Sequence, residues 1–216
     1  MLEVEGPRSA AQEAPSQPRW AGARNLVPVQ KFNEHCIELL SQVAGRDDVH
    51  SPAIRQNVAL WLAMDTSAVR RISRTPFVLL DIRFQDNVWW SEVAHRQGRE
   101  PGPSVASGRL PSDLSGDLMY ETLMFCWQMV GANRTVAQTS FGMSPSVVDL
   151  ISELTPQDVR GIAGRQSSAV QIRWDTNIRF WQELLQAALS ADDARLAALQ
   201  LHAKLLLVGG LVHALD

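Results

Sequence analysis

The chain has 216 residues, 45% of them hydrophobic and 20% charged, which is typical of one larger or two small globular domains and excludes a wholly disordered chain. Its 20 basic and 23 acidic residues give a net charge of -3. No overall positive field therefore attracts nucleic acid, and any DNA contact depends on a local patch or a basic partner.

The first 26 residues are dominated by Ala, Pro, Gln, Glu, Ser and Arg and show neither helical nor strand periodicity. This composition is typical of a disordered tail, which we predict for residues 1–26. The stretch contains no apolar core of the signal-peptide kind, and two cysteines are too few for a disulfide framework. We therefore expect a reducing, cytoplasmic environment.

Residues 27–97 are predicted to form a first helical unit. Apolar side chains recur at helical spacing, and Ser, Pro and Asp residues provide helix start signals. The expected elements are a helix near 29–43, a helix after Ser51 and Pro52, a third helix from Asp65, an extended segment over 77–84 and a helix after Asn87.

Residues 98–116 are rich in Gly, Pro and Ser, which interrupt every possible period, so we interpret them as an interdomain linker. Residues 117–216 form the second predicted unit, which ends in a C-terminal helix. Its expected elements are helices over 117–131 and 134–141, two helices capped by Ser144 and Thr155, a strand-like alternation over 168–174, a helix over 177–189 and a last helix from Ala191 that is interrupted at Gly209 and Gly210.

The predicted fold class is mainly α, with two tandem helical units that each contain a helix-turn-helix-like segment and one short extended strand. The longest apolar run, residues 205–215, is about half of the roughly 20 residues that a membrane span requires. We therefore expect no membrane contact. The apolar last helix needs a partner surface, which we expect to be the first unit, with a second chain as the alternative.

The two units resemble each other in sequence. A shift of 90 residues without gaps gives about 8 identities over about 30 positions, where chance gives about 2. The identical pairs are Val58 and Val148, Leu60 and Leu150, Val69 and Val159, Arg70 and Arg160, Ile72 and Ile162, Ile82 and Ile172, Arg83 and Arg173, and Asn87 and Asn177. We interpret the pattern as a tandem duplication.

Residues 135–154 have the pattern of a helix-turn-helix, because a short helix is followed by a turn at Gly142 and a second helix capped by Ser144. The second helix carries no basic side chain, and acidic groups beside phosphates are unfavourable. Its polar positions are Ser146, Asp149 and Glu153. A helical hairpin used for packing or dimer contacts is therefore an equal alternative.

The first unit differs at the matching place. The helix after Pro52 begins with Arg, Gln and Asn, which are side chains able to contact guanine or adenine edges in a bidentate manner, and an arginine cluster follows in the next helix. The predicted DNA-binding residues are Arg55, Gln56, Asn57, Arg70, Arg71 and Arg74. A solvated polar face is the alternative interpretation.

Catalytic and metal-binding patterns are missing from the sequence. The five histidines show no metal-ligand spacing, and neither a phosphate-binding glycine loop nor a nucleophile elbow is found. Cys36 and Cys126 lie on apolar helix faces, which is typical of buried inert thiols. We expect a protein that is not an enzyme and that holds no cofactor or metal.

Residues 141–177 resemble, without a gap, a segment of the FlhD family of bacterial flagellar transcriptional regulators. In that family the segment reads as an LGIS turn, an acidic pair, a hydrophobic helix, an LT turn, a second helix and an RFRFDD-like strand. The positions that carry the resemblance are Gly142, Ser144, Asp149, Leu150, Leu154, Thr155, Ala163, Arg173, Trp174 and Asp175. The preceding helix continues it, with Gln128 at the shared glutamine.

The resemblance implies a helical, dimerising subunit of a transcription activator. Such a subunit acts at promoter DNA with a second, zinc-containing subunit of the FlhC type, which makes more of the DNA contact, and recruits RNA polymerase. Two units in one chain could supply the equivalent of a homodimer, and a homodimer of the whole chain is the alternative. The basic C-terminal end of the family is not reproduced here.

The leading functional hypothesis is therefore a DNA-binding transcription activator subunit. An alternative is a protein-interaction adaptor or antiactivator that keeps the fold and makes no DNA contact, because the helix after Ser144 lacks basic side chains. An enzyme is the least favoured class, since no catalytic constellation is found.

Overall fold

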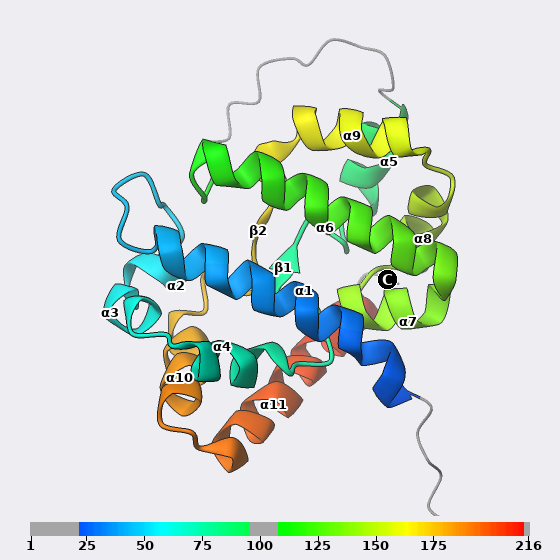
Figure 1. Ribbon diagram of the computed structural model, residues 1–216. Coiled ribbons are helices and arrows are strands. Elements are labelled where there is room, and N and C mark those ends of the chain that lie inside the picture. The colour runs from blue at the N-terminus through cyan, green and yellow to red at the C-terminus, as the bar shows by residue number, and fades with distance from the viewer. Residues whose placement is uncertain (1–21, 96–107, 214–216) are drawn as a thin grey trace, which may run out of the picture.

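The computed structural model describes residues 22–95 and 108–213. Within these ranges the chain forms eleven α-helices, one 3-10 turn and one two-stranded sheet, so the prediction of a mainly α fold is confirmed. Figure 1 shows two of the three longest helices, α1 (Gly22–Val43) and α6 (Ser112–Ala132), side by side in front of the small sheet.

The elements of the two halves follow the same order. In the first half, α1 is followed by α2 (Pro52–Arg55), α3 (Val58–Leu62), α4 (Thr66–Ser73), β1 (Leu80–Asp81) and α5 (Asn87–His95). In the second half, α6 is followed by α7 (Arg134–Phe141), α8 (Pro145–Ser152), α9 (Pro156–Arg165), the 3-10 turn η1 (Ser167–Ala169), β2 (Gln171–Ile172), α10 (Ile178–Leu189) and α11 (Asp193–His213).

The helix starts follow the predicted caps. The side chain of Ser51 accepts a hydrogen bond from the backbone of α2, Ser144 does the same for α8, and Asp65 for α4. Thr155 and Asp158 form a reciprocal capping box at the start of α9. Each cap satisfies backbone N–H groups that have no partner inside the helix.

Several predicted boundaries differ from the structure. The predicted tail over 1–26 lies outside the described residues up to position 21, and its last five positions belong to α1. The predicted linker over 98–116 lies outside them up to position 107, and positions 112–116 belong to α6. Both helices therefore begin earlier than predicted. In α6 the first turn has the Ser-rich composition of the predicted linker, although Leu114 and Ser115 within it are buried.

Three elements also differ in extent. The helix predicted after Pro52 is split into α2 and α3 at Asn57, whose backbone leaves the helical region at φ -122°. The extended segments reduce to strands of two residues each. Gly209 and Gly210 do not interrupt α11, because a glycine costs a helix only about 1 kcal/mol and flanking residues can offset it.

The sheet relates the two halves directly. Strands β1 and β2 pair antiparallel, with Leu80 opposite Ile172 and Asp81 opposite Gln171. Positions 81 and 171 are separated by the same 90 residues that align the halves in sequence. Antiparallel strands with equivalent residues face to face are related by a local two-fold rotation. The duplication remains a prediction, and this register agrees with it.

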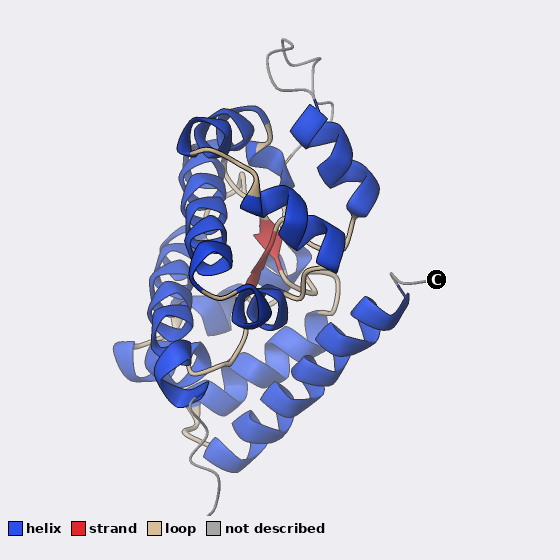
Figure 2. Cartoon of the chain, turned by 90° about the vertical axis from the view of Figure 1, so that its right-hand side faces the viewer, coloured by secondary structure: helices blue, strands red, loops and turns tan. Residues whose placement is uncertain are grey.

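The two halves exchange their helices. Helix α5 of the first half packs against α8 of the second, while α10 of the second half packs against α2, α3 and α4 of the first. Figure 2 shows the strands at the centre of the molecule with helices around them. The buried apolar side chains of both halves form one cluster. The two predicted units therefore share one core.

Candidate nucleic-acid interface

The first group of predicted DNA-binding residues lies at the end of α2. Arg55 and Gln56 are exposed, and Arg55 Nη1 donates to Val49 O at 3.4 Å. Asn57 is only 5% exposed, and its Nδ2 donates to Ala53 O at 3.0 Å and to Ile178 O at 3.3 Å. The amide of Asn57 thus joins the two halves, and a base contact would require breaking these bonds.

The second group lies on and just after α4. Arg70 is 66% exposed, with Nε 3.2 Å from Glu34 Oε1. Arg71 is half-buried and its Nε donates to Ala188 O, at the end of α10, at 2.7 Å. Arg74 is exposed at the C-cap. Arg71 is therefore used in packing the two halves, whereas Arg70 and Arg74 face solvent.

The two groups occupy one end of the molecule. Helices α2, α3 and α4 all pack against α10, and Figure 1 shows them together beside that helix. Four of the six predicted residues, Arg55, Gln56, Arg70 and Arg74, are exposed there. We call these four side chains the α2/α4 surface. It carries three arginines, one of which, Arg70, is paired with Glu34 of α1.

The helix-turn-helix-like segment of the second half has a different character. Gly142 ends α7 in the left-handed region at φ 62°, and a Cβ there would lie 2.4 Å from Leu207 Cδ1 of α11. Only glycine fits this turn, which α11 covers. Sequence reasoning missed this contact, since nothing local marks Leu207 as the partner of position 142.

The exposed side of α8 is acidic. A neighbouring arginine, Arg134, donates from Nη2 to Asp149 Oδ1 at 2.8 Å and to Ser152 Oγ at 2.7 Å. Val147, Val148 and Ile151 are buried on the opposite side. The helix therefore presents no unpaired cation of its own to a phosphate backbone, unlike the α2/α4 surface.

A buried arginine was also missed. Arg173 donates from Nε to Val78 O at 2.9 Å and from Nη2 to Leu80 O at 3.1 Å and Phe141 O at 2.9 Å. Its Nη1 lies 3.6 Å from Asp81 Oδ1. Burial lowers the pKa of the guanidinium, and the Asp81 charge partly offsets this. Arg173 thus ties β1 and α7 to β2.

Asp175, close to Arg173 in sequence, makes a second link between the halves. Its buried carboxylate accepts hydrogen bonds from Ser51 Oγ, from Ala53 N at 3.2 Å and from Arg109 Nη1 at 2.6 Å. In the other direction, Ser144 Oγ donates to Asn87 of the first half. The two N-cap serines are therefore each bound by the opposite half.

The described residues hold neither a cluster of metal ligands nor a membrane-spanning helix. They contain no group of three or more His, Cys, Asp or Glu side chains placed to hold a metal ion. None of their helices is long and apolar enough to cross a bilayer. Cys36 and Cys126 are buried, and burial raises the pKa of both thiols.

Comparison with known families gives one match. Residues 116–213 match the model of the FlhD family, described as flagellar transcriptional activator, so the resemblance noted from the sequence is confirmed for the second half. No curated protein and no solved structure matches the chain. The matched segment includes Gly142, Arg173 and Asp175, which the structure places at the turn under α11 and in the contacts between the halves.

Proposed function

We propose that this chain, whose residues 116–213 are an FlhD-type transcriptional activator segment, is a regulator subunit that acts at promoter DNA together with a basic partner. The observation that carries the proposal is the difference in exposed charge between the two halves. The family-matched half presents an acidic α8, while the first half presents the exposed arginines of the α2/α4 surface.

The charge of the chain supports the need for a partner. A net charge of -3 gives no long-range attraction to DNA, and only a few arginines of the α2/α4 surface can neutralise phosphates. A subunit of the zinc-containing FlhC type would supply the remaining cations and most of the base contacts. Recruitment of RNA polymerase would then fall to the complex.

The helices exchanged between the halves support the idea that one chain replaces a dimer of two family subunits. Helix α5 of the first half packs against the second half, and α10 of the second half packs against the first. Two subunits of a homodimer would pack in the same way. One chain therefore takes the position of two family subunits in the proposed complex. A homodimer of the chain is the alternative assembly.

The test is DNA binding by the full chain, alone and with an FlhC-like protein, between about 50 and 200 mM salt. Arg70→Ala with Arg74→Ala should weaken binding to all fragments and lower the salt slope by about two, one for each lost phosphate contact. Gln56→Ala should relax the sequence preference. The matched control is Arg134→Ala with Arg195→Ala, which removes two exposed arginines from other surfaces.

Unchanged binding in the Arg70→Ala, Arg74→Ala variant would overturn the assignment of the α2/α4 surface. Asn57→Ala and Arg71→Ala are unsuitable probes, because both side chains bond to α10 and their loss would change stability first.

The second candidate function is an adaptor or antiactivator without DNA contact. It is favoured by the pairing of Arg134 with Asp149 on α8, which leaves that helix without a cation for phosphate. A stable stoichiometric complex with a transcription regulator, with no DNA retention even at low salt, would select this alternative.

A further inference from the structure

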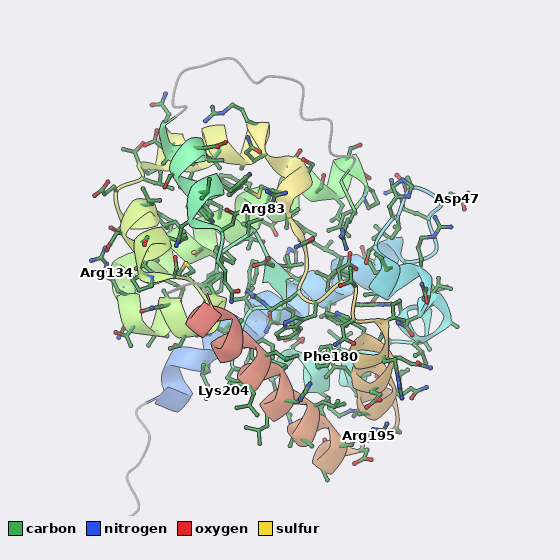
Figure 3. All side chains as sticks on the ribbon, turned by 180° about the vertical axis from the view of Figure 1, so that it is seen from behind. Asp47, Arg83, Arg134, Phe180, Arg195 and Lys204 are labelled. Atoms are coloured by element: carbon green, nitrogen blue, oxygen red, sulfur yellow. The ribbon has the colours of Figure 1, made fainter. Side chains whose placement is uncertain are left out.

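A cavity of about 430 Å³ lies where α11 meets the segments that follow the two strands. The first half contributes Asp81, at the end of β1, and three residues of the segment 83–86, which precedes α5. The second half contributes residues 173–174, which follow β2, and residues 206–207 of α11. In Figure 3, which views the molecule from the side of α11, Arg83 is labelled above that helix. The cavity is therefore bordered by both halves, and its volume falls in the range of small-molecule sites.

The guanidinium of Arg173 keeps unused hydrogen-bonding capacity at this cavity. Its Nε and Nη2 donate to backbone carbonyls, whereas its Nη1 makes no hydrogen bond with a described residue. The side chain is only 6% exposed and lines the cavity. Among the described residues only Trp90 Nε1 is both fully buried and unbonded, so Nη1 is accessible from the cavity. Since enclosed N–H groups normally have an acceptor, Nη1 favours a ligand that brings one.

A carboxylate stands beside this guanidinium. Asp81 Oδ1 lies 3.6 Å from Arg173 Nη1, beyond the length of a hydrogen bond, and accepts from Phe84 N at 3.4 Å. Its Oδ2 makes no hydrogen bond with a described residue. A second pair at the cavity is similar, because Arg83 Nη1 lies 3.7 Å from Asp86 Oδ2. Both pairs therefore leave donors and acceptors for a ligand.

These charges select a zwitterion. The charged side chains that line the cavity are two arginines and two aspartates, which carry no net charge, so neither a net anion nor a net cation is favoured. An α-amino acid carries its carboxylate and its ammonium on one carbon, close together as Arg173 Nη1 and Asp81 Oδ1 are. Each group would then form a charge-assisted hydrogen bond. Trp174 and two leucines of α11 supply apolar surface. We propose that the cavity binds a free α-amino acid with an aliphatic side chain.

The bound amino acid would join α11 to the rest of the fold. Gln85 Nε2 already donates to Leu207 O at 3.5 Å, next to the cavity, and the side chain of Leu207 lies over Gly142. A ligand between Arg173 and Leu206 touches both the body and the helix, so binding stabilises the docked position of α11. The site is separate from the α2/α4 surface.

The experiment uses the full chain and small probes that differ by one group. L-leucine carries both charges and an aliphatic side chain, 4-methylpentanoate lacks the ammonium, 3-methylbutylamine lacks the carboxylate, and glycine lacks the side chain. Isothermal titration calorimetry at neutral pH measures their affinities. We expect L-leucine to bind at least about tenfold more tightly than each of the others, because each lacks one of the three interactions. L-leucine should also raise the melting temperature of the chain.

Two variants locate the binding, each with a matched control. Arg83→Met removes one guanidinium from the cavity, and Arg195→Met removes an arginine of similar exposure and pairing elsewhere. Leu206→Trp fills the cavity, and Leu205→Trp places the same bulk at a 64% exposed position of α11. Arg83→Met should weaken binding of L-leucine about tenfold, and Leu206→Trp should abolish it, while both controls bind normally. Far-UV circular dichroism checks that all four variants fold.

No saturable binding of L-leucine up to about 10 mM would overturn the proposal, as would binding that survives Leu206→Trp. Equal or tighter binding of 4-methylpentanoate would overturn the choice of a zwitterion and show that the arginines alone select the ligand. Because none of these readouts involves DNA, the proposal can fail while the DNA-binding proposal holds, and the reverse.

Discussion

Arg83 and Arg173 are aligned in the sequences of the two halves, 90 residues apart, yet their surroundings are opposite. Arg173 is buried and bonded to three backbone carbonyls. Arg83 is exposed, 3.7 Å from Asp86 and stacked over Trp89. The backbone differs here too, because the left-handed conformation of Arg83 (φ 50°) falls one residue later in the second half, at Trp174 (φ 52°). What a residue does is decided by what the other half places opposite it.

The largest expected effect tests this difference directly. Arg173→Met should destabilise the fold by about 3–5 kcal/mol, because it leaves buried carbonyls and Asp81 without their cationic partner. Arg83→Met should stay within about 0.5 kcal/mol, since an exposed ion pair contributes little. Urea unfolding followed by far-UV circular dichroism measures both. Similar losses in the two variants would show that the halves are equivalent here after all.

Two tryptophans sharpen the comparison: Trp90 in α5 and Trp181 in α10 each donate the backbone N–H to the residue four positions earlier, Asp86 and Asn177. Trp181 Nε1 donates to Arg173 O at 2.9 Å, whereas the buried Nε1 of Trp90 has no hydrogen-bond partner among the described residues. Changing either residue to Phe removes a similar volume, so the cavity costs largely cancel. Trp181→Phe should therefore destabilise the fold by about 1–3 kcal/mol more than Trp90→Phe, because it leaves the buried Arg173 carbonyl without its hydrogen-bond donor.

The same chemical denaturation experiment measures both tryptophan variants. If their free energies of unfolding fall equally, the bond to Arg173 contributes nothing net, and the asymmetry between the halves lies in the arginine alone.

Local signals in the sequence predicted most of the helices. Gly142 ends α7 as expected, and Ser144 with Pro145 starts α8 where the pattern placed it. Caps and apolar periodicity act over a few residues, so one sequence reveals them. The family resemblance was also readable, because it depends on short-range motifs such as the turn at Gly142.

The contacts between the halves could not be predicted in the same way. Arg173 looks like any exposed strand arginine until Val78, Leu80 and Phe141 are placed around it. Asn57 has the side chain of a base reader, and only the position of α10 shows that its amide bonds to Ile178 O. For the predicted DNA-binding residues, the sequence indicated suitable side-chain types. It did not indicate which of these side chains are exposed.

The caps of α4 and α9 should give a smaller effect. Asp65 and Thr155 occupy equivalent positions, and Ala at either should cost about 1 kcal/mol. In α9 the hydrogen bonds from Thr155 hold the pKa of Asp158 below its usual value. The contribution of Asp158 is therefore present above the unfolded pKa of about 3.9 and is lost as pH falls through the lower folded value.

Unfolding of Thr155→Ala at pH 7 and at about pH 2.5 tests this coupling. The cost of the substitution should shrink at the lower pH, because the hydroxyl of Thr155, which donates to Asp158 Oδ2 at 2.7 Å, no longer has a charged carboxylate as its acceptor. An equal loss of unfolding free energy at both pH values would show that the cap does not depend on the ionisation of Asp158.

The smallest expected effect concerns the two cysteines, since we expect no difference between the labelling rates of Cys36 and Cys126. Burial raises the pKa of both thiols, with Glu121 adding to the shift at Cys36. Neither should react with iodoacetamide at pH 8 while the protein is folded, because the thiolate is the nucleophile. Any labelling of these cysteines then measures the unfolding that exposes them.

Because the halves exchange helices around one core, both thiols should react at the same rate, which is set by global unfolding. Faster labelling of Cys36 alone, resolved by peptide mass spectrometry, would show that the first half opens independently and that the shared core does not couple the two.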